Sequence, residues 1–245
     1  MWMSGSPGCS ISGYEVKTPL GSFLLSVGSS RDLPDGERAV RRFLSVFENR
    51  FNLPRRYGLE AVVSKPPHRI LFLDIETTGL SPRYPMFLVG LMYYDGEGFR
   101  FEQLLARNPS EEGAMLYHLR GLMEEFDLVV TFNGGSFDLP YIIGRMTRLG
   151  IDPPEGLREK NYDLLIYSRK KWRGTLPNCR LQTLEREICG RRRVGDIPSS
   201  MIPAAYREFL ASGDPRIIRA IMFHNLLDLL TMAELIAALA EVDHL

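Results

Sequence analysis

The sequence has few cysteines and no long uncharged apolar run. Its three cysteines, Cys9, Cys179 and Cys189, include no CxxC pair, which argues against a disulfide framework and against a zinc ribbon. The amino terminus lacks the apolar segment of a signal peptide. Nowhere do about 18 uncharged apolar residues run together, as a membrane span requires. We therefore expect a cytoplasmic protein with no membrane partner.

An excess of charge of one sign is also missing. The chain has 30 Lys and Arg against 30 Asp and Glu, which excludes a basic coat protein, an acidic tail protein and a polycationic membrane binder. With 245 residues, 44% of them hydrophobic, it can bury one sizeable core and carry an appendage.

Residues 1–66 are predicted to form an N-terminal appendage, and residues 67–245 the main domain. The first dozen residues are rich in Gly, Ser and Pro, so we expect a disordered start. Thr18-Pro19-Leu20-Gly21 is a turn sequence between two hairpin strands. Apolar residues between Asp35 and Phe51 recur every three or four positions, which predicts one amphipathic helix.

Apolar runs in the main domain predict an α/β fold. We expect a buried central strand at 70–73, an antiparallel hairpin of 86–94 with 99–105, and a strand at 128–132. Helices are predicted at 111–125, at 139–148 and after Asp214-Pro215, where Asp is a good N-cap. This order predicts a mixed sheet, with the first three strands antiparallel and the later ones parallel, flanked by helices.

Two carboxylates end the predicted central strand. Asp74 and Glu76 lie two residues apart, so strand alternation puts both on one side of the sheet. Two acids at a core strand repel each other, and a divalent cation would remove that conflict. The alternative is an exposed strand end with two solvated acids before a turn.

A third acid follows the next buried run. Asp138 lies five residues after Asn133, and it is either a helix cap or a third carboxylate beside the end of the central strand. The latter requires the two strands to be neighbours. Asn133 and the glycines after it would then let the backbone approach a substrate closely.

His224 and Asp228 share one face of the predicted carboxyl-terminal helix, because they are four residues apart. That face also carries apolar residues, and an Asp that points toward a core needs a partner. The alternative is an ordinary His-to-Asp helix pair at the edge of the apolar stripe.

Together these residues resemble the three exonuclease motifs of the DEDD superfamily of 3′-to-5′ exonucleases, which have a ribonuclease H-like fold. More particularly, the sequence is similar to the YprB-type ribonuclease H-like exonuclease family. The DEDD motifs correspond to Asp74-Ile75-Glu76-Thr77-Thr78-Gly79, Asn133-x-x-x-Phe137-Asp138 and His224-x-x-x-Asp228. The YprB-type pattern is matched by Phe132-Asn133-Gly134-x-x-Phe137-Asp138-Leu139-Pro140, Leu181-x-x-Leu184-Glu185 and His224-Asn225-x-x-Asp228. The resemblance covers about Arg69 to Leu235.

One departure concerns His224. Familiar histidine-type members place the His five positions before the last Asp, whereas this chain has the four-residue spacing of tyrosine-type members. On a helix four residues turn by about 40° and five by about 140°, so His224 would reach the site from another direction. The YprB-type pattern has the same combination, which we interpret as a subtype marker.

The resemblance implies two divalent cations, Mg²⁺ or Mn²⁺, held by carboxylate oxygens. Asp74, Glu76 and Asp228 would hold one ion, and Asp74 with Asp138 the other. The implied reaction releases 5′-mononucleotides, with His224 as the general base and Glu76 helping to position the terminal nucleotide. Further motif residues are implied in substrate binding: Thr77, Thr78, Gly79, Asn133 and Phe137. Asp163 matches an acid that the family places near the site.

Basic residues concentrate between Arg158 and Arg193, with eleven Lys and Arg against four acids. Such a stretch favours phosphate contacts to a single strand, with Tyr167 and Trp172 available for base stacking. Its central cations, Arg169, Lys170, Lys171 and Arg173, are candidate substrate ligands. The alternative is a solvated helix face whose aromatics turn into the core.

The leading hypothesis is therefore a metal-dependent 3′-to-5′ exonuclease acting on the 3′ ends of single-stranded DNA or RNA. A catalytically silent nucleic-acid-binding module and an oligonucleotide phosphodiesterase are the alternatives. The family resemblance also suggests a helicase or a repair protein as a partner.

Overall fold

The computed structural model describes residues 11–241. Cys9 and most of the first dozen residues, where we expected a disordered start, lie outside this range. Seven strands form one sheet in the order β1-β2-β5-β4-β3-β6-β7. The strands are β1 (Tyr14–Thr18), β2 (Gly21–Ser29), β3 (Ile70–Thr77), β4 (Met86–Tyr94), β5 (Phe99–Leu105), β6 (Leu128–Thr131) and β7 (Asn161–Asp163). The helices are α1 (Gly36–Glu48), α2 (Leu59–Val63), α3 (Glu112–Met123), α4 (Asp138–Arg148), α5 (Leu164–Trp172), α6 (Leu181–Glu187), α7 (Ile202–Ser212) and α8 (Pro215–Ala240).

The sheet is mixed, as predicted. β3 pairs with β4, and β4 with β5, in antiparallel register. On its other side β3 pairs in parallel with β6, which pairs in parallel with β7. The carboxyl ends of β3 and β6 therefore lie at the same edge of the sheet, because parallel strands run in the same direction.

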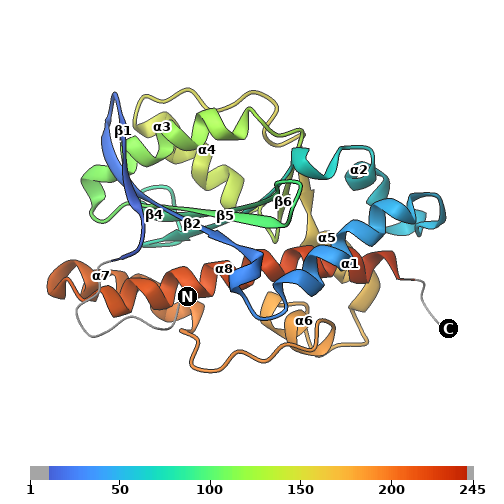
Figure 1. Cartoon of the computed structure of the whole chain (residues 1–245). Helices are drawn as coiled ribbons and strands as arrows, with labels where there is room; N and C mark the ends of the chain where they lie inside the picture. The colour runs from blue at the N-terminus through green and yellow to red at the C-terminus, as the bar shows by residue number, and fades with distance from the viewer. Residues whose placement is uncertain (1–10, 242–245) are drawn as a thin grey trace.

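Helices cover both faces of the sheet. Figure 1 shows α3 and α4 on one face and α1 with α8 on the other. Alternation along β3 sends Ile70 and Phe72 into the core with α1 and α8, while Leu71, Leu73 and Ile75 enter the core with α3 and α4. Asp74 and Glu76 continue the row that faces α8.

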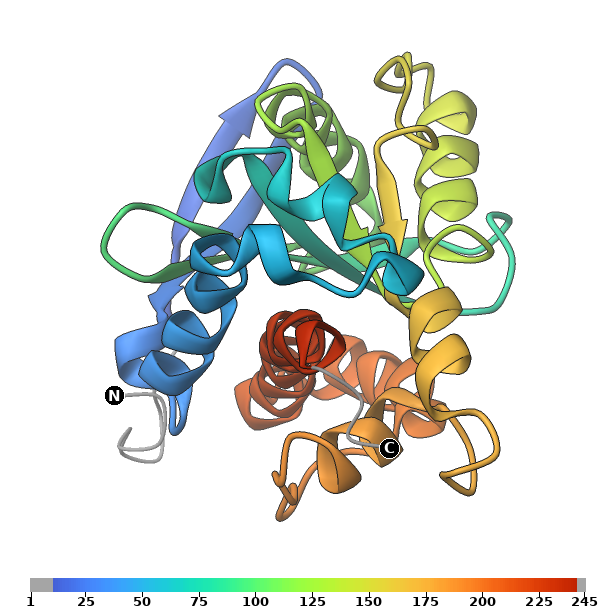
Figure 2. The same cartoon turned by 90° about the vertical axis from the view of Figure 1, so that its right-hand side faces the viewer.

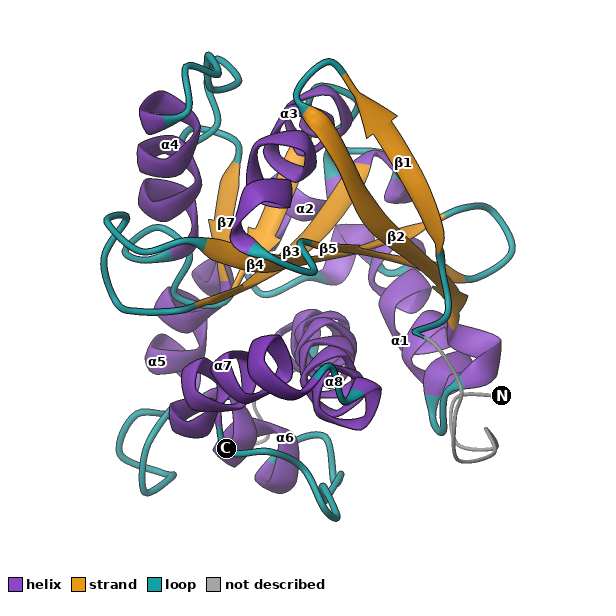
Figure 3. Cartoon of the chain, turned by 90° about the vertical axis from the view of Figure 1, so that its left-hand side faces the viewer, coloured by secondary structure: helices purple, strands orange, loops and turns teal. Residues whose placement is uncertain are grey.

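The N-terminal hairpin belongs to the same sheet. β1 and β2 pair across Thr18 to Gly21, and β2 pairs along its length with β5. Helix α1 packs against α8, and the two lie side by side in Figure 2. Figure 3 shows β1 and β2 as one wing of the sheet, with β7 and α4 at the opposite end. The sheet thus runs across residue 66, the predicted limit of the appendage.

Helix α8 is the central helix of its layer. It begins where predicted, since the Asp214 carboxylate accepts a hydrogen bond from the backbone N–H of Arg216 at 2.9 Å. By length and composition alone α8 could cross a membrane, but 83% of its most apolar window is buried inside the protein. Its apolar surface is therefore already covered by the sheet, α1 and α7.

Candidate functional site

A cleft of about 830 Å³ opens at the carboxyl end of β3, between the sheet edge and α8. Asp74, Ile75 and Glu76 of β3 form one part of its wall, and His224 and Asp228 of α8 another. The remaining lining residues come from three connecting regions, from the first residues of α4 and α6, and from α5: Phe132, Asn133, Phe137, Asp138, Leu165, Arg169, Asn178, Cys179, Arg180, Leu181, Gln182, Pro198, Ser199 and Ser200. All four predicted metal ligands and the predicted base line this one cleft.

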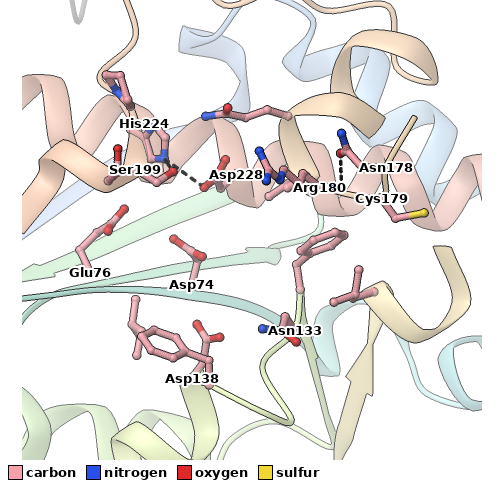
Figure 4. Close-up of a pocket in the computed structure, with 18 of the residues that line it drawn as sticks. Asp74, Glu76, Asn133, Asp138, Asn178, Cys179, Arg180, Ser199, His224 and Asp228 are labelled. Atoms are coloured by element: carbon pink, nitrogen blue, oxygen red, sulfur yellow. Dashed lines mark hydrogen bonds and ion pairs between the residues drawn. The ribbon is translucent and has the colours of Figure 1, made fainter. Parts of the chain in front are cut away.

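The four carboxylates reach the cleft from three separate elements. Figure 4 shows Asp74, Asp138 and Asp228 directed toward the same space from β3, α4 and α8. Glu76 stands beside Asp74 on the same strand, as alternation predicted. Asp138 is the first residue of α4, and it reaches β3 because a backbone hydrogen bond from Ile75 holds its carboxyl.

Burial and mutual repulsion oppose ionisation of these acids. Burial raises the pKa of Asp74 well above its usual range, and the charges of Asp228 and Asp138 raise it further. Burial and then the charge of Asp74 act in the same direction on the pKa of Glu76. The pKa of Asp138 rises to about 7, mainly through burial. The nearby charge of Arg193 lowers the pKa of Asp74 but does not outweigh burial and the neighbouring acids.

Divalent cations fit this donor set. Carboxylate oxygens are the hard ligands that Mg²⁺ and Mn²⁺ prefer, and a cation would offset the repulsion among the buried acids. Among residues 11–241, however, no three His, Cys, Asp or Glu side chains already stand as a coordination shell. The acids share one cleft, and cation binding would have to draw them closer together.

A buried amide relay holds Asp74. The Asn225 amide donates to Oδ2 of Asp74 at 2.8 Å, and Gln103 donates to Oδ1 of Asn225 at 2.9 Å. Gly90 of β4 permits this approach of α8, because a Cβ there would lie 2.0 Å from Oδ1 of Asn225. Asn225 is part of the sequence motif, whereas Gln103 has no local signal that links it to the site.

Asp163 supports the loop that carries Asn133. Its carboxylate accepts from the backbone N–H groups of Asn133 at 2.8 Å and Gly135 at 3.2 Å, and it caps α5 through Leu165 at 3.0 Å. Asn133 has a left-handed backbone, with φ of 68°, a conformation that Asn tolerates better than most residues. Asp163 does not line the cleft, so it acts on the loop.

The motif residues after Glu76 shape a turn. The hydroxyl of Thr77 donates to the carbonyl of Gly79 at 2.8 Å, and that of Thr78 donates to Pro85 at 3.0 Å. Thr77, Thr78 and Gly79 are not among the residues that line the cleft, whereas Asn133 and Phe137 are. As candidate substrate ligands, the first three therefore stay predictions.

The basic stretch divides between two environments. Arg169 and Arg180 line the cleft, whereas Lys170, Lys171 and Arg173 lie outside its lining. Lys171 instead donates to the carbonyl of Ala238 at 2.9 Å. Of the aromatic residues, Trp172 is buried in the core and Tyr167 stacks on Tyr162 with ring centroids 4.5 Å apart. The prediction of base stacking by Trp172 was thus wrong, because its ring is packed in the hydrophobic core.

Arg191 and Arg193 are buried in ion pairs, which corrects their assignment to a phosphate-binding strip. Arg193 donates to Glu185 at 2.5 Å and to Asp196 at 3.1 Å, and it also donates to Asp228. Arg191 lies between Glu185 and Glu234, two fully buried acids. Buried acids need such partners. The acids Asp228 and Glu234 lie outside the basic stretch, so a local charge count does not show their pairing with these arginines.

Apart from Arg180, which belongs to the basic stretch, the sequence did not indicate three groups of residues in or beside the cleft. Asn178, Cys179, Arg180 and Gln182 form a wall before and at the start of α6, Ser199 and Ser200 close the cleft near His224, and Asp196 contacts His224 from the same loop. Only the basic character of the stretch and the motif segment that begins at Leu181 pointed to this region.

The comparisons with known proteins agree with this fold. Residues 71–240 match the RNase H superfamily. The chain is 29% identical over 172 residues to the uncharacterized protein YprB of Bacillus subtilis, covering 69% of this chain and 41% of that protein. It is 42% identical over 67 residues to DNA polymerase 1 of Aeropyrum pernix, which is 26% of this chain and 7% of the polymerase. The chain therefore spans less than half the length of these relatives.

A solved structure shares the fold. The family B DNA polymerase of the archaeon Pyrobaculum calidifontis superposes with a TM-score of 0.55 and 20% identity, covering 69% of this chain and 24% of that one. The predicted resemblance to the YprB type is confirmed by the sequence match, and the mixed sheet by the fold match. The chain belongs to the RNase H superfamily.

Proposed function

We propose that the chain is a metal-dependent 3′-to-5′ exonuclease that hydrolyses single-stranded nucleic acid to 5′-mononucleotides. The observation that carries this proposal is the convergence of Asp74, Glu76, Asp138, Asp228 and His224 on one open cleft. Membership of the RNase H superfamily supports a nuclease-type function. The sequence resemblance to DEDD exonucleases supports the direction of cleavage.

The carboxylates would hold two divalent cations. Asp74, Glu76 and Asp228 are the residues for one ion, and Asp74 with Asp138 for the other. Such ions, when bound, activate the attacking water and stabilise the leaving 3′ oxygen. The raised pKa values of Asp74, Glu76 and Asp138 favour this role, because buried acids with raised pKa values are stabilised in their ionised form by a bound cation.

The protein's own side chains would deprotonate the attacking water and orient the nucleic-acid strand. His224 lines the cleft beside Asp228, with Nε2 3.4 Å from Oδ2 of Asp228, so it can accept a proton from water at that position. Arg169 and Arg180 are exposed cations of the cleft wall, suited to phosphates of the strand that leads away from the acids.

Degradation of end-labelled strands tests the proposal. Single-stranded DNA and RNA, each labelled at the 3′ or the 5′ end, are incubated with Mg²⁺, Mn²⁺ or EDTA. We expect metal-dependent release of the 3′ label as a mononucleotide at the earliest times, with 5′-labelled strands shortening stepwise. The Asp74→Ala/Asp138→Ala variant should be inactive, and Asp152→Ala, which removes an exposed carboxylate outside the cleft, should match the parent.

Three results would contradict the proposal. Release from the 5′ end would reverse the direction, and cleavage restricted to the shortest oligonucleotides would indicate an oligonucleotide phosphodiesterase. Salt-dependent binding without cleavage under either metal would indicate a silent binding module.

A further inference from the structure

His224 has different neighbours at its two ring nitrogens. Its Nδ1 lies 2.8 Å from Oδ2 of Asp196, while its Nε2 lies 3.2 Å from the hydroxyl of Ser199 and 3.4 Å from Oδ2 of Asp228. The ring is 1% exposed and lines the cleft. Its orientation is therefore set by the protein, and Asp196 makes the shortest of these contacts.

Asp196 can serve His224 only as an acceptor. Arg193, which has no acceptor atom, donates to the same Oδ2 at 3.1 Å. Oδ1 of Asp196 is buried without a protein partner, so the hydrogen bonds of this carboxylate go to Arg193 and His224. A carboxylate bonded to an arginine stays ionised, so the nitrogen facing it must carry a proton. Nη1 of Arg193 is farther from Nδ1, at 3.5 Å.

We propose that Asp196 is a positioning residue that holds His224 in the tautomer protonated on Nδ1 and turns the lone pair of Nε2 toward the cleft. The inference rests on the proposed function, because a general base must present a lone pair to the water it deprotonates. The hydroxyl of Ser199 donates to that lone pair here, and a water in the cleft would take its place during reaction.

This pairing gives a reason for the unusual spacing of His224 and Asp228. At four residues the two side chains share one helix face, so the helix alone brings the ring next to Asp228 without fixing which nitrogen faces the cleft. Asp196, in the loop between α6 and α7, fixes which nitrogen faces the cleft because it binds Nδ1. A histidine oriented by a carboxylate in this way presents one defined nitrogen.

The loop that carries Asp196 is fixed to the protein interior. Arg193 donates to Glu185 at 2.5 Å, and Arg191 donates to Glu185 at 3.1 Å. Gly195 follows with φ of 71°, a left-handed turn that glycine adopts without strain and that brings Asp196 back toward α8. Both buried arginines therefore anchor the carboxylate that contacts His224.

The direct test is the tautomer of His224 in the metal-free chain of residues 1–245. Long-range ¹H–¹⁵N correlation spectra of the ¹⁵N-labelled chain distinguish the two neutral tautomers, at about pH 8.5, two units above the ordinary pKa of histidine. The His224 signals are assigned by their loss in His224→Gln. We expect protonation on Nδ1. Protonation on Nε2, or averaging between both forms, would overturn the proposal.

Asp196→Asn tests the consequence for catalysis. The asparagine amide can donate to Nδ1, which favours the opposite tautomer and removes the lone pair from Nε2. We expect the His224 signals to show protonation on Nε2, and kcat to fall by about 10²- to 10⁴-fold with KM unchanged. Asp152→Asn, at an exposed position outside the cleft, should change neither the tautomer nor kcat.

Further readouts separate positioning from other roles. Mn²⁺ affinity of Asp196→Asn should match the parent, because Asp196 is not a proposed ligand, and Ser199→Ala should keep the Nδ1 tautomer. Full activity of Asp196→Asn with an unchanged tautomer would refute the inference. An inactive parent whose His224 is protonated on Nδ1 would refute the exonuclease instead, so the two failures are distinguishable. If Asp196→Asn does not fold, the parent spectrum still decides the tautomer.

Discussion

Two sets of arginines from one basic stretch have opposite environments. Arg169 and Arg180 are exposed and line the cleft, whereas Arg191 and Arg193 have side chains only 10% and 7% exposed and pair with buried acids. A local surplus of positive charge is equally compatible with both, because it does not show which acids lie nearby in the fold. The first pair is suited to a ligand, and the second holds the cleft together.

The largest effect on stability is expected when Arg193, one of the two arginines paired with buried acids, is replaced. Arg193→Met leaves the carboxylate of Asp228 without its buried counter-charge and leaves Glu185 with Arg191 alone, so the free energy of unfolding should fall by about 3–5 kcal/mol. Its neighbour Arg192 is exposed, and Arg192→Met should change stability by no more than about 0.5 kcal/mol. Urea denaturation of both variants measures the difference. Equal, small effects would contradict a structural role for Arg193.

The second expected effect concerns the acids that no arginine neutralises. Asp138 keeps its proton in the folded protein to about pH 7, whereas its ordinary pKa is 3.8. A raised pKa stabilises the fold below the unfolded value, and this contribution is lost as the pH rises through the folded pKa. The Tm of the metal-free protein should therefore decline between about pH 4 and pH 7.

Two controls separate this effect from other titrations. Asp138→Asn should flatten the decline in Tm, and Mg²⁺ should raise the Tm most at neutral pH, where the acids are ionised. A Tm of the metal-free parent that does not fall over this range, or that Asp138→Asn leaves unchanged in slope, would contradict the burial of the Asp138 carboxyl.

A smaller effect, on binding of single-stranded DNA, is expected when Arg169 and Arg180 are replaced. Arg169→Ala/Arg180→Ala should weaken binding of single-stranded DNA and reduce the salt slope of log K by about 1.4, as two lost phosphate contacts would. Stability should stay within about 0.5 kcal/mol of the parent. Arg186→Ala, an exposed α6 cation outside the cleft lining, is the matched control. Fluorescence anisotropy against salt would show an unchanged slope if the strand lies elsewhere.

The smallest effect is expected on the alkylation rate of Cys179, which lies in the part of the cleft wall between α5 and α6. Cys179 lines the cleft, whereas Cys189 is buried and burial raises the pKa of its thiol to about 12. In a Cys9→Ser background, alkylation should therefore modify Cys179 first, because the thiolate is the reactive form. Single-stranded DNA should slow this reaction. Unchanged alkylation with DNA bound would place the strand away from the α5–α6 wall.

Local patterns predicted the central strands and the acids that they carry. Apolar runs mark β3, β4 and β5, and alternation along β3 places Asp74 and Glu76 on one face. The parallel pairing of β3 with β6 then brings Asp138 to the same edge. The Asp214-Pro215 signal predicted the start of α8, and helical spacing put His224 and Asp228 on one of its faces.

Long-range pairing explains what the sequence did not predict. β2 joins the main sheet through β5, some 80 residues later in the chain, and nothing in the hairpin itself identifies that partner. The loop that carries Arg191, Arg193 and Asp196 has no helical or strand period. Its role depends on Glu234 and His224, which only the fold brings beside it.

Mn²⁺ titration of the metal-free protein tests the central claim most directly. The account predicts two bound Mn²⁺ ions by calorimetry and by electron paramagnetic resonance, with binding lost in Asp74→Ala/Asp138→Ala and retained in Asp152→Ala. Binding that is absent from the parent, or that survives in Asp74→Ala/Asp138→Ala, would contradict the claim that the cleft carboxylates form a cation site.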